Sequence, residues 1–98
     1  MRDPHKRNEE YTPPSGSRPT RIVAAAVLQD GRVWTGERHG FIIPIVWTDT
    51  GKRVDQDQQG FWTDDGRFVT RTAARAIACR YGQLRTDFDK VLLSEHLW

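Results

Sequence analysis

A chain of 98 residues has room for one domain, because domains usually take roughly 100–150 residues. Its composition is 37% hydrophobic and 29% charged, which is too polar for a membrane protein, and 10% aromatic, which is too aromatic for a wholly disordered one. The longest apolar run, residues 22–28, is far shorter than the roughly 20 residues that span a bilayer. The first twenty residues lack the apolar centre of a signal peptide. We therefore expect no membrane contact and no export from the compartment of synthesis.

Cysteine and charge content narrow the function classes further. The single Cys79 allows neither an internal disulfide nor, alone, a zinc site, which excludes a disulfide-rich secreted scaffold. The net charge of +2 is too small to indicate a nucleic-acid-binding protein by itself. Most of the cations are arginine, however, and the stretch from Arg71 to Arg85 holds four arginines and no acid. Arginine is suited to planar, two-point contacts with phosphate or carboxylate groups.

Residues 1–20 are predicted to form a flexible tail, and residues 21–98 a single domain. The tail contains four prolines and the sequence Ser15-Gly16-Ser17, and Tyr11 is its only large apolar residue apart from Met1. Such a segment cannot bury enough surface to offset the entropy lost when its backbone is ordered. We expect a mobile arm unless Tyr11 docks on a neighbour. The remainder is small for one hydrophobic core, which favours self-association.

The domain is predicted to open with a β-hairpin. Residues 21–28 are almost entirely apolar, and residues 32–36 resume a strand-like pattern after the turn sequence Asp30-Gly31. An Asp-Gly pair between two such segments is a strong hairpin signal, because glycine readily adopts the positive φ that the turn requires. The apolar first strand is expected to lie centrally in a sheet, covered on both faces.

A helix is less clearly indicated from Glu37 to about Trp47. Apolar residues recur there at helical spacing, but Gly40 and Pro44 oppose the assignment, because an interior proline kinks or ends a helix. The pattern leaves open whether Pro44 shortens or removes this helix. Residues 48–59 are polar and are predicted to form a connecting loop.

A second hairpin is predicted over residues 60–69, with its turn at Asp64-Asp65-Gly66. Thr70 is a candidate N-cap for a helix from Arg71 to Tyr81, and Gly82 follows in the position typical of a helix end. The last residues, 91–98, are apolar enough for a final strand or a packed terminal segment. Together these elements predict an α+β fold, a small mixed domain of two β-hairpins with one or two helices.

No pattern in the sequence indicates catalysis. Cys79 lies in the alanine-rich helix, where a small buried thiol is the ordinary occupant, and no neighbour in sequence would activate it. The histidines have no metal-ligand spacing, and the paired acids lie in a turn and a loop. Phosphate-loop, nucleophile-elbow and zinc-protease motifs are missing. No enzymatic activity, metal or cofactor is expected.

Anion binding is the chemistry that the residues do suggest. Arg38 and His39 stand where a strand passes into a possible helix, and Arg71 stands at the start of the second helix. Free amides and the helix dipole favour an anion at such positions. Arginines combined with the rings of Phe61 and Trp62 suit a nucleotide. The alternative is that the aromatic residues form the core and that Arg38 pairs with a nearby acid.

From about residue 22 to residue 98, short motifs follow one another in a particular order. They are Trp34-Thr35-Gly36 with Arg38-His39, Gln59-Gly60-Phe61, Gly66-Arg67-Phe68, Arg71, the alanine-rich stretch 74–78, Gly82-Gln83, and residues 92–98. This order resembles the first type of Thoeris anti-defence protein, a group of small phage proteins that act as sponges for a signalling molecule. The resemblance implies a homo-oligomer, a dimer or a hexamer, that sequesters cyclic ADP-ribose isomers without cleaving them in the host cytoplasm. Larger assemblies of the group are also associated with cyclic oligonucleotides.

The resemblance also implies roles for individual residues. Phe61 would contact the adenine, and Thr70 or Arg71 would line the pocket. Arg85, just beyond Gly82-Gln83, would meet a phosphate.

Arg38 and His39 would form a second anionic site or an interface. The sequence departs from the group's pattern at Pro44, and Ala73 and His96 stand where acids are expected. These departures leave open a changed ligand or the loss of sponge activity.

Two other functions remain open at this point. One is inhibition of a host or defence protein by direct contact through exposed aromatic residues such as Trp62 and Trp98. The other is weak, nonspecific binding of nucleic acid through residues 71–85, which would depend steeply on salt concentration.

Overall fold

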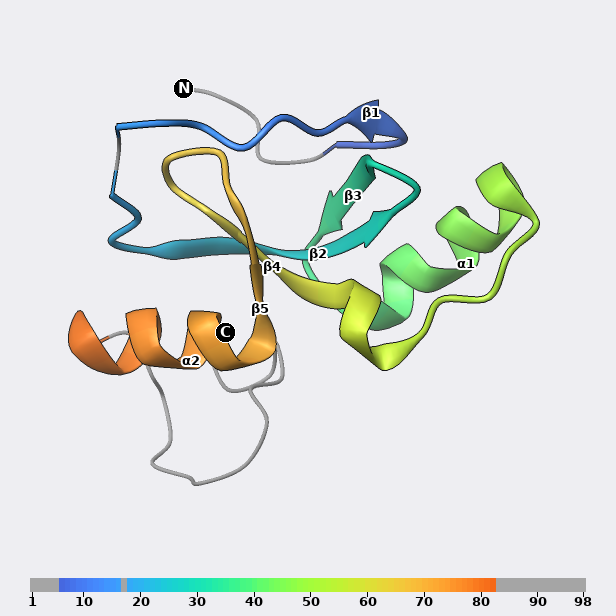
Figure 1. Ribbon diagram of the computed structural model, residues 1–98. Helices are drawn as coiled ribbons and strands as arrows, with labels where there is room; N and C mark the ends of the chain where they lie inside the picture. Colours follow the sequence, from blue (N-terminus) through green and yellow to red (C-terminus); the bar gives the residue numbers. More distant parts are fainter. Residues whose placement is uncertain (1–5, 17, 83–98) are drawn as a thin grey trace.

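A computed structural model of the chain describes residues 6–16 and 18–82. They form a five-stranded antiparallel sheet with strand order β1-β3-β2-β4-β5 and two helices (Figure 1). The elements are β1 (Glu9–Glu10), β2 (Ile22–Gln29), β3 (Arg32–Gly36), α1 (His39–Thr50), the short 3₁₀ helix η1 (Gln56–Gln58), β4 (Gln59–Thr63), β5 (Phe68–Thr70) and α2 (Arg71–Arg80). The predicted α+β class and both predicted hairpins are confirmed.

The apolar strand β2 lies at the centre of the sheet, as its sequence predicts. Its antiparallel partners are β3 on one side and β4 on the other. Asp30 and Gly31, which join β2 to β3, have φ values of 54° and 75°. Positive φ at both central residues is characteristic of the hairpin turn whose twist matches that of the strands.

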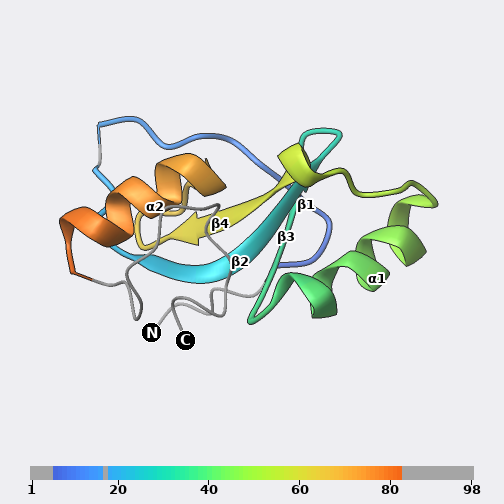
Figure 2. The same cartoon turned by 90° about the horizontal axis from the view of Figure 1, so that it is seen from below.

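Both helices lie on the same face of the sheet. Ala25 of β2 pairs with Phe61 of β4, so these two side chains share a face. Ala25 packs in the cluster that holds α1, and Phe61 packs in the cluster that holds α2. Seen from the helix side, α2 lies over β4 and α1 lies toward the other end of the sheet (Figure 2).

The N-terminal segment covers the opposite face, where Ala24, Ala26, Val33 and Trp62 form a third cluster. The ring of Tyr11 packs edge-on against Trp62 with centroids 5.7 Å apart, and its hydroxyl accepts a hydrogen bond from the Phe68 amide at 3.0 Å. In Figure 1 the N-terminal segment runs above the sheet, α2 lies below it, and α1 lies to its right.

This docking differs from the mobile arm expected for residues 1–20, at least over residues 6–16. The sequence predicted that the arm would be mobile unless Tyr11 packs against a neighbour. Tyr11 does pack, against Trp62 of its own chain. Composition indicated mobility because the segment has few apolar side chains. The contacts that hold it are largely backbone contacts: β1 pairs with β3, and the Thr35 amide donates to the Lys6 carbonyl at 2.9 Å. An edge strand can form on such bonds with few apolar residues of its own.

Helix α1 continues through Pro44, which answers the question that the sequence left open about this proline. Pro44 cannot donate to the carbonyl of Gly40, but both residues are exposed and water can take the place of the missing donor. Ile42 and Val46 are buried on the opposite side of α1 and hold it against the sheet. The helix extends to Thr50, into residues predicted as loop, and ends at Gly51 with φ 68°.

Helix α2 is close to its prediction. The Thr70 hydroxyl accepts a hydrogen bond from the Ala73 amide at 3.2 Å, which confirms the N-cap, and Gly82 has φ 68° beyond the helix end. Ala74 and Ala78 are buried against the sheet. Cys79, expected to be buried, is exposed. The final strand or packed segment predicted at residues 91–98 lies outside the described residues.

Candidate functional site

Several of the predicted site residues lie together where both helices begin. His39 is the first residue of α1, Arg71 is the first residue of α2, and both lie close to the start of β4. His39 Nε2 is 2.6 Å from the Gly60 carbonyl oxygen, and Gly60 pairs with Thr70 across the β4–β5 ladder. Residues that the sequence assigned to two separate sites thus lie in one neighbourhood, and most of them have structural roles there.

Phe61 is a core residue. Its side chain is 0% exposed and packs with Ile22, Val69, Ala74 and Ala78 beneath α2. The predicted contact with an adenine is therefore corrected, because a ring must leave the core before a base can stack on it. The sequence also allowed the alternative that the aromatic residues form the core, and this alternative is correct for Phe61.

His39 joins α1 to the sheet. Its ring is buried, lies edge-on to Phe61 with centroids 5.1 Å apart, and shares a hydrogen bond with the Gly60 carbonyl. Burial lowers the pKa of His39 below its usual 6.5, the Gly60 carbonyl opposes this, and the charge of Arg71 lowers the pKa further. A neutral ring at pH 7 brings no positive charge to an anion, so His39 contributes position and not charge.

Arg71 keeps a positive charge in a half-buried position. Its guanidinium donates to the Gln59 side-chain carbonyl at 2.6 Å and forms no ion pair with any carboxylate of residues 6–16 or 18–82. Burial lowers the pKa of Arg71, which still leaves the group protonated. Neither α1 nor α2 has an acidic residue in its first turn. The first turns of the two helices therefore contribute no negative charge beside Arg71.

The remaining predicted residues contribute less to a site. Thr70 uses its hydroxyl to cap α2. Arg38 is the N-cap residue of α1 and makes no side-chain capping bond there. Trp62, proposed as an exposed contact for a host protein, is only 7% exposed and is covered by Tyr11, which corrects that role. Two further predicted residues, Arg85 and Trp98, lie outside the described residues.

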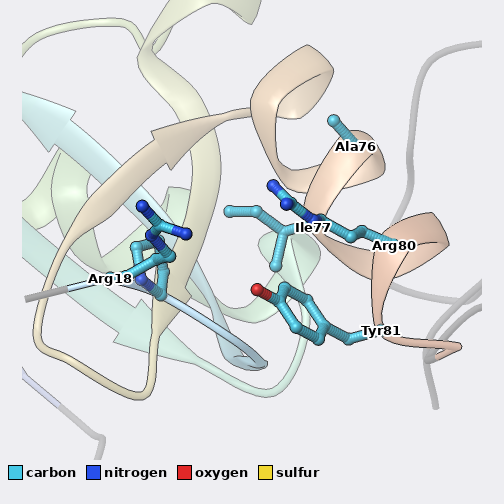
Figure 3. A pocket seen from close by; sticks show the side chains of 6 residues that line it. Arg18, Ala76, Ile77, Arg80 and Tyr81 are labelled. Carbon is cyan, nitrogen blue, oxygen red and sulfur yellow. The ribbon is translucent and has the colours of Figure 1, made fainter.

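A pocket of about 360 Å³ lies between the N-terminal segment and the last turn of α2. In Figure 3 the guanidinium of Arg80 and the hydroxyl of Tyr81 extend from α2 toward Arg18, with Ile77 between the two sides. The Arg80 guanidinium lies 5.9 Å from the centre of the Tyr81 ring, in a cation–π contact. The lining consists of Arg18, Pro19, Ala76, Ile77, Arg80 and Tyr81.

The chemistry of this pocket suits an anion that carries a ring. Among the residues that the structure describes, the lining contains two guanidinium groups and no carboxylate, imidazole or thiol. Within the described parts of the chain, neither Arg18 nor Arg80 forms an ion pair. The Tyr81 ring and the Ile77 side chain add a flat and an apolar surface beside the two charges.

Sequence reasoning missed the residues that line this pocket. Arg80 belongs to the acid-free stretch from Arg71 to Arg85, and Tyr81 was predicted as the last residue of the helix. Arg18 was assigned to the tail. Nothing in the sequence pairs Arg18 with a helix more than fifty residues away, so the fold was needed to bring them together.

Two negative findings apply to the residues that the structure describes. None of their helices is both long enough and apolar enough to cross a membrane. No three of their histidine, cysteine, aspartate and glutamate side chains gather closely enough to hold a metal ion.

Residues 21–98, about four fifths of the chain, match the model of the family described as Phage T4 y16D protein. The chain belongs to the phage T4 y16D protein family. It is therefore a small phage protein. No curated protein and no solved structure matches it. In this y16D family member, the family match begins at residue 21. Arg18 and Pro19 of the pocket in Figure 3 lie before the match, whereas the pocket residues of α2 lie within it.

Proposed function

We propose that this phage protein binds and sequesters a small anionic nucleotide signal, of the cyclic ADP-ribose type, in the pocket between Arg18 and α2. The observation that carries the proposal is the pairing of two guanidinium groups, free of ion pairs among the described residues, with an exposed aromatic ring in one acid-free pocket. The resemblance to the Thoeris sponge proteins supports the same class of ligand. Function in the host cytoplasm as a homo-oligomer is part of this proposal.

The size and charge of the pocket support a nucleotide. Small-molecule sites commonly enclose about 300–1,000 Å³, and this pocket has about 360 Å³. Arginine binds phosphate through two parallel hydrogen bonds, so Arg18 and Arg80 suit a diphosphate bridge. A base can stack on the Tyr81 ring, which Arg80 already approaches.

Sequestration without cleavage is the second part of the proposal. The described part of the pocket lining has no carboxylate, imidazole or thiol to act as a general base or nucleophile. Arginine and tyrosine hold an anionic ligand without activating water at neutral pH.

The test is ligand-dependent thermal stabilisation, followed by analysis of the released nucleotide. Cyclic ADP-ribose, its glyco-cyclic isomers, cyclic dinucleotides and linear ADP-ribose are each added to the purified full chain, and the melting temperature is recorded. We expect a rise with at least one cyclic compound and recovery of that compound unchanged after heat denaturation. Binding that leaves ligand at 100 times its dissociation constant stabilises the folded state by about 2.7 kcal/mol.

Matched variants locate the site. Arg80→Ala and Arg18→Ala are expected to abolish the rise, whereas Arg53→Ala, which removes the same charge from an exposed loop position, is expected to keep it. A rise that survives Arg80→Ala and Arg18→Ala places the ligand elsewhere. Failure of every compound to raise the melting temperature contradicts the binding proposal, and recovery of a linear product contradicts sequestration.

A further inference from the structure

The loop that brings Arg18 to the pocket has no regular secondary structure of its own. Arg18, Pro19 and Thr20 precede β2, and none of them belongs to a helix or strand. The opposite wall of the pocket is formed by the last turn of α2 and by Tyr81 beyond it (Figure 3). Loops are generally more mobile than helices, so a pocket between these two walls needs a contact that fixes the loop.

Asp64, in the turn between β4 and β5, holds the loop two residues beyond Arg18. Its Oδ1 accepts hydrogen bonds from the amide of Thr20 at 3.1 Å and from the amide of Arg21 at 3.2 Å. Its Oδ2 accepts a third from the Thr20 hydroxyl at 2.7 Å. The Asp64 amide donates to the Arg21 carbonyl at 3.0 Å. One turn residue is thus bonded to two consecutive residues of the loop.

The Asp64 carboxylate is ionised at neutral pH, which strengthens these bonds. Burial raises the pKa of Asp64, but the hydrogen bonds from the Thr20 hydroxyl and from the amides of Thr20 and Arg21 outweigh it, so the pKa lies below its usual 3.8. Hydrogen bonds to a charged acceptor are roughly twice as strong as neutral ones. Over residues 6–16 and 18–82, Asp64 forms no ion pair that would draw it away from the loop.

The hairpin that carries Asp64 also carries the opposite wall of the pocket. β5 ends at Thr70, and α2 begins at the next residue with the Thr70 hydroxyl as its cap. The same hairpin holds the chain before Arg18, because the Phe68 amide donates to the Tyr11 hydroxyl at 3.0 Å. The β4–β5 hairpin is therefore the common base of both walls.

We infer that Asp64 is a positioning residue of this pocket: it fixes the loop after Arg18, holds that side chain opposite α2, and thereby sets the affinity for an anionic nucleotide. The inference rests on the proposed function. A loop that is in place for only a fraction of the time lowers the apparent affinity by that fraction. The direction of the effect is specific, because removing a negative charge beside the pocket would by itself favour an anion, whereas losing the position of Arg18 disfavours it.

The experiment is calorimetric titration of the full chain with cyclic ADP-ribose and its glyco-cyclic isomers. Asp64→Ala removes both carboxylate oxygens and is expected to raise the dissociation constant by about tenfold, as when the loop is in place about a tenth of the time. Asp64→Asn keeps the oxygen that accepts both amides and is expected to bind as tightly as wild type or more tightly. Asp57→Ala is the control, since it removes the same charge from an exposed position of η1 and should leave the affinity unchanged.

Amide hydrogen exchange without ligand examines the loop directly. The amides of Thr20 and Arg21 should exchange faster in Asp64→Ala than in wild type, Asp64→Asn or Asp57→Ala. Circular dichroism confirms that each variant is folded. If Asp64→Ala does not fold, Thr20→Val decides, because it removes the hydroxyl bond to Oδ2 and leaves the hairpin turn unchanged. Thr20→Val is expected to raise the dissociation constant by about threefold.

The outcomes separate this inference from the proposed function. Wild type that binds while Asp64→Ala binds equally well, or while Asp64→Asn is weakened as much as Asp64→Ala, overturns the inference and leaves the proposed function in place. Unchanged exchange of the Thr20 and Arg21 amides in Asp64→Ala overturns it as well, as does unchanged binding by Thr20→Val where that variant decides. Wild type that binds none of these compounds contradicts the proposed function, and the inference fails with it.

Discussion

Gly60 occupies a position that no other residue fits. A Cβ atom there would collide with the Val69 carbonyl oxygen and lie only 2.7 Å from the end of the Phe68 ring. The same glycine offers its carbonyl oxygen to His39, so strands β4 and β5 and the start of α1 all depend on the close approach. Gly40, in the first turn of α1, is the natural comparison, because a Cβ atom there would meet no atom of a neighbouring residue within 4 Å.

Replacing these two glycines by alanine should have opposite effects on stability. Gly60→Ala is expected to lower the free energy of unfolding by about 1–3 kcal/mol, because the backbone must move to admit the methyl group. Gly40→Ala is expected to raise it by about 0.5–1 kcal/mol, since alanine restricts the unfolded chain and suits a helix. Urea unfolding followed by circular dichroism measures both. Equal effects of the two substitutions would contradict this account.

At the level of single residues, the sequence predicted neighbourhoods better than roles. It named His39, Phe61 and Arg71 as candidate residues, with His39 in a second site or an interface, and the structure brings all three close together. Strand alternation also predicts that Phe61 and Trp62 face opposite ways. It does not predict what covers each face, and here both are covered, Phe61 by α2 and Trp62 by Tyr11. A ring that looks suited to stacking on a base is in fact part of the core.

At the level of elements, predictions hold where several local signals agree. Helix α2 has a capping threonine, an alanine-rich interior and a glycine beyond its end, and each indicates the same boundaries. Helix α1 has opposing signals, because Pro44 disfavours a helix while Ile42 and Val46 supply the contacts that hold one. Those contacts are with distant strands, and local propensity contains no information about them.

The cap of α2 gives a test of the role assigned to Thr70. Thr70→Ala removes the acceptor of the Ala73 amide and should lower the free energy of unfolding by about 1 kcal/mol. Thr70→Ser keeps the hydroxyl and should stay close to wild type. Thermal unfolding without ligand measures this structural contribution directly. A serine variant as unstable as the alanine variant would show that the methyl group, and not the cap, provides the stability.

At the level of the whole molecule, an ion pair links the N-terminal segment to the end of α1. Arg7 donates two hydrogen bonds to Asp49, at 3.0 and 2.7 Å, and the buried Trp34 donates a third at 2.8 Å. The N-terminal segment therefore meets both β3 and α1 at this carboxylate. The amino-acid composition could not reveal the contact between Arg7 and Asp49. Arg7 belongs to a segment whose composition predicts no ordered structure, and Asp49 lies near the end of α1.

This arrangement predicts a specific loss of stability in acid. Hydrogen bonds from Arg7 and Trp34 hold the pKa of Asp49 at about 2, below its usual 3.8. The unfolded chain therefore binds the proton more readily than the folded chain, so the contribution of Asp49 is complete above about pH 4 and is lost as the pH falls toward 2. The difference in unfolding free energy between wild type and Asp49→Asn should shrink over this range.

Urea unfolding at several pH values between 5 and 2 measures that difference. The double variant Arg7→Gln with Asp49→Asn completes a thermodynamic cycle and isolates the contribution of the pair. A difference between wild type and Asp49→Asn that is the same at pH 5 and pH 2 would show that Asp49 does not depend on these partners.

The lengths of the outermost strands have a consequence for solubility. β1 and β5 have only two and three residues, and β1 consists of two glutamates. Edge strands this short, one of them charged, leave little unpaired backbone for another chain to extend. Fibril growth by edge-to-edge addition is thereby disfavoured, even in a protein that displays aromatic rings on its surface.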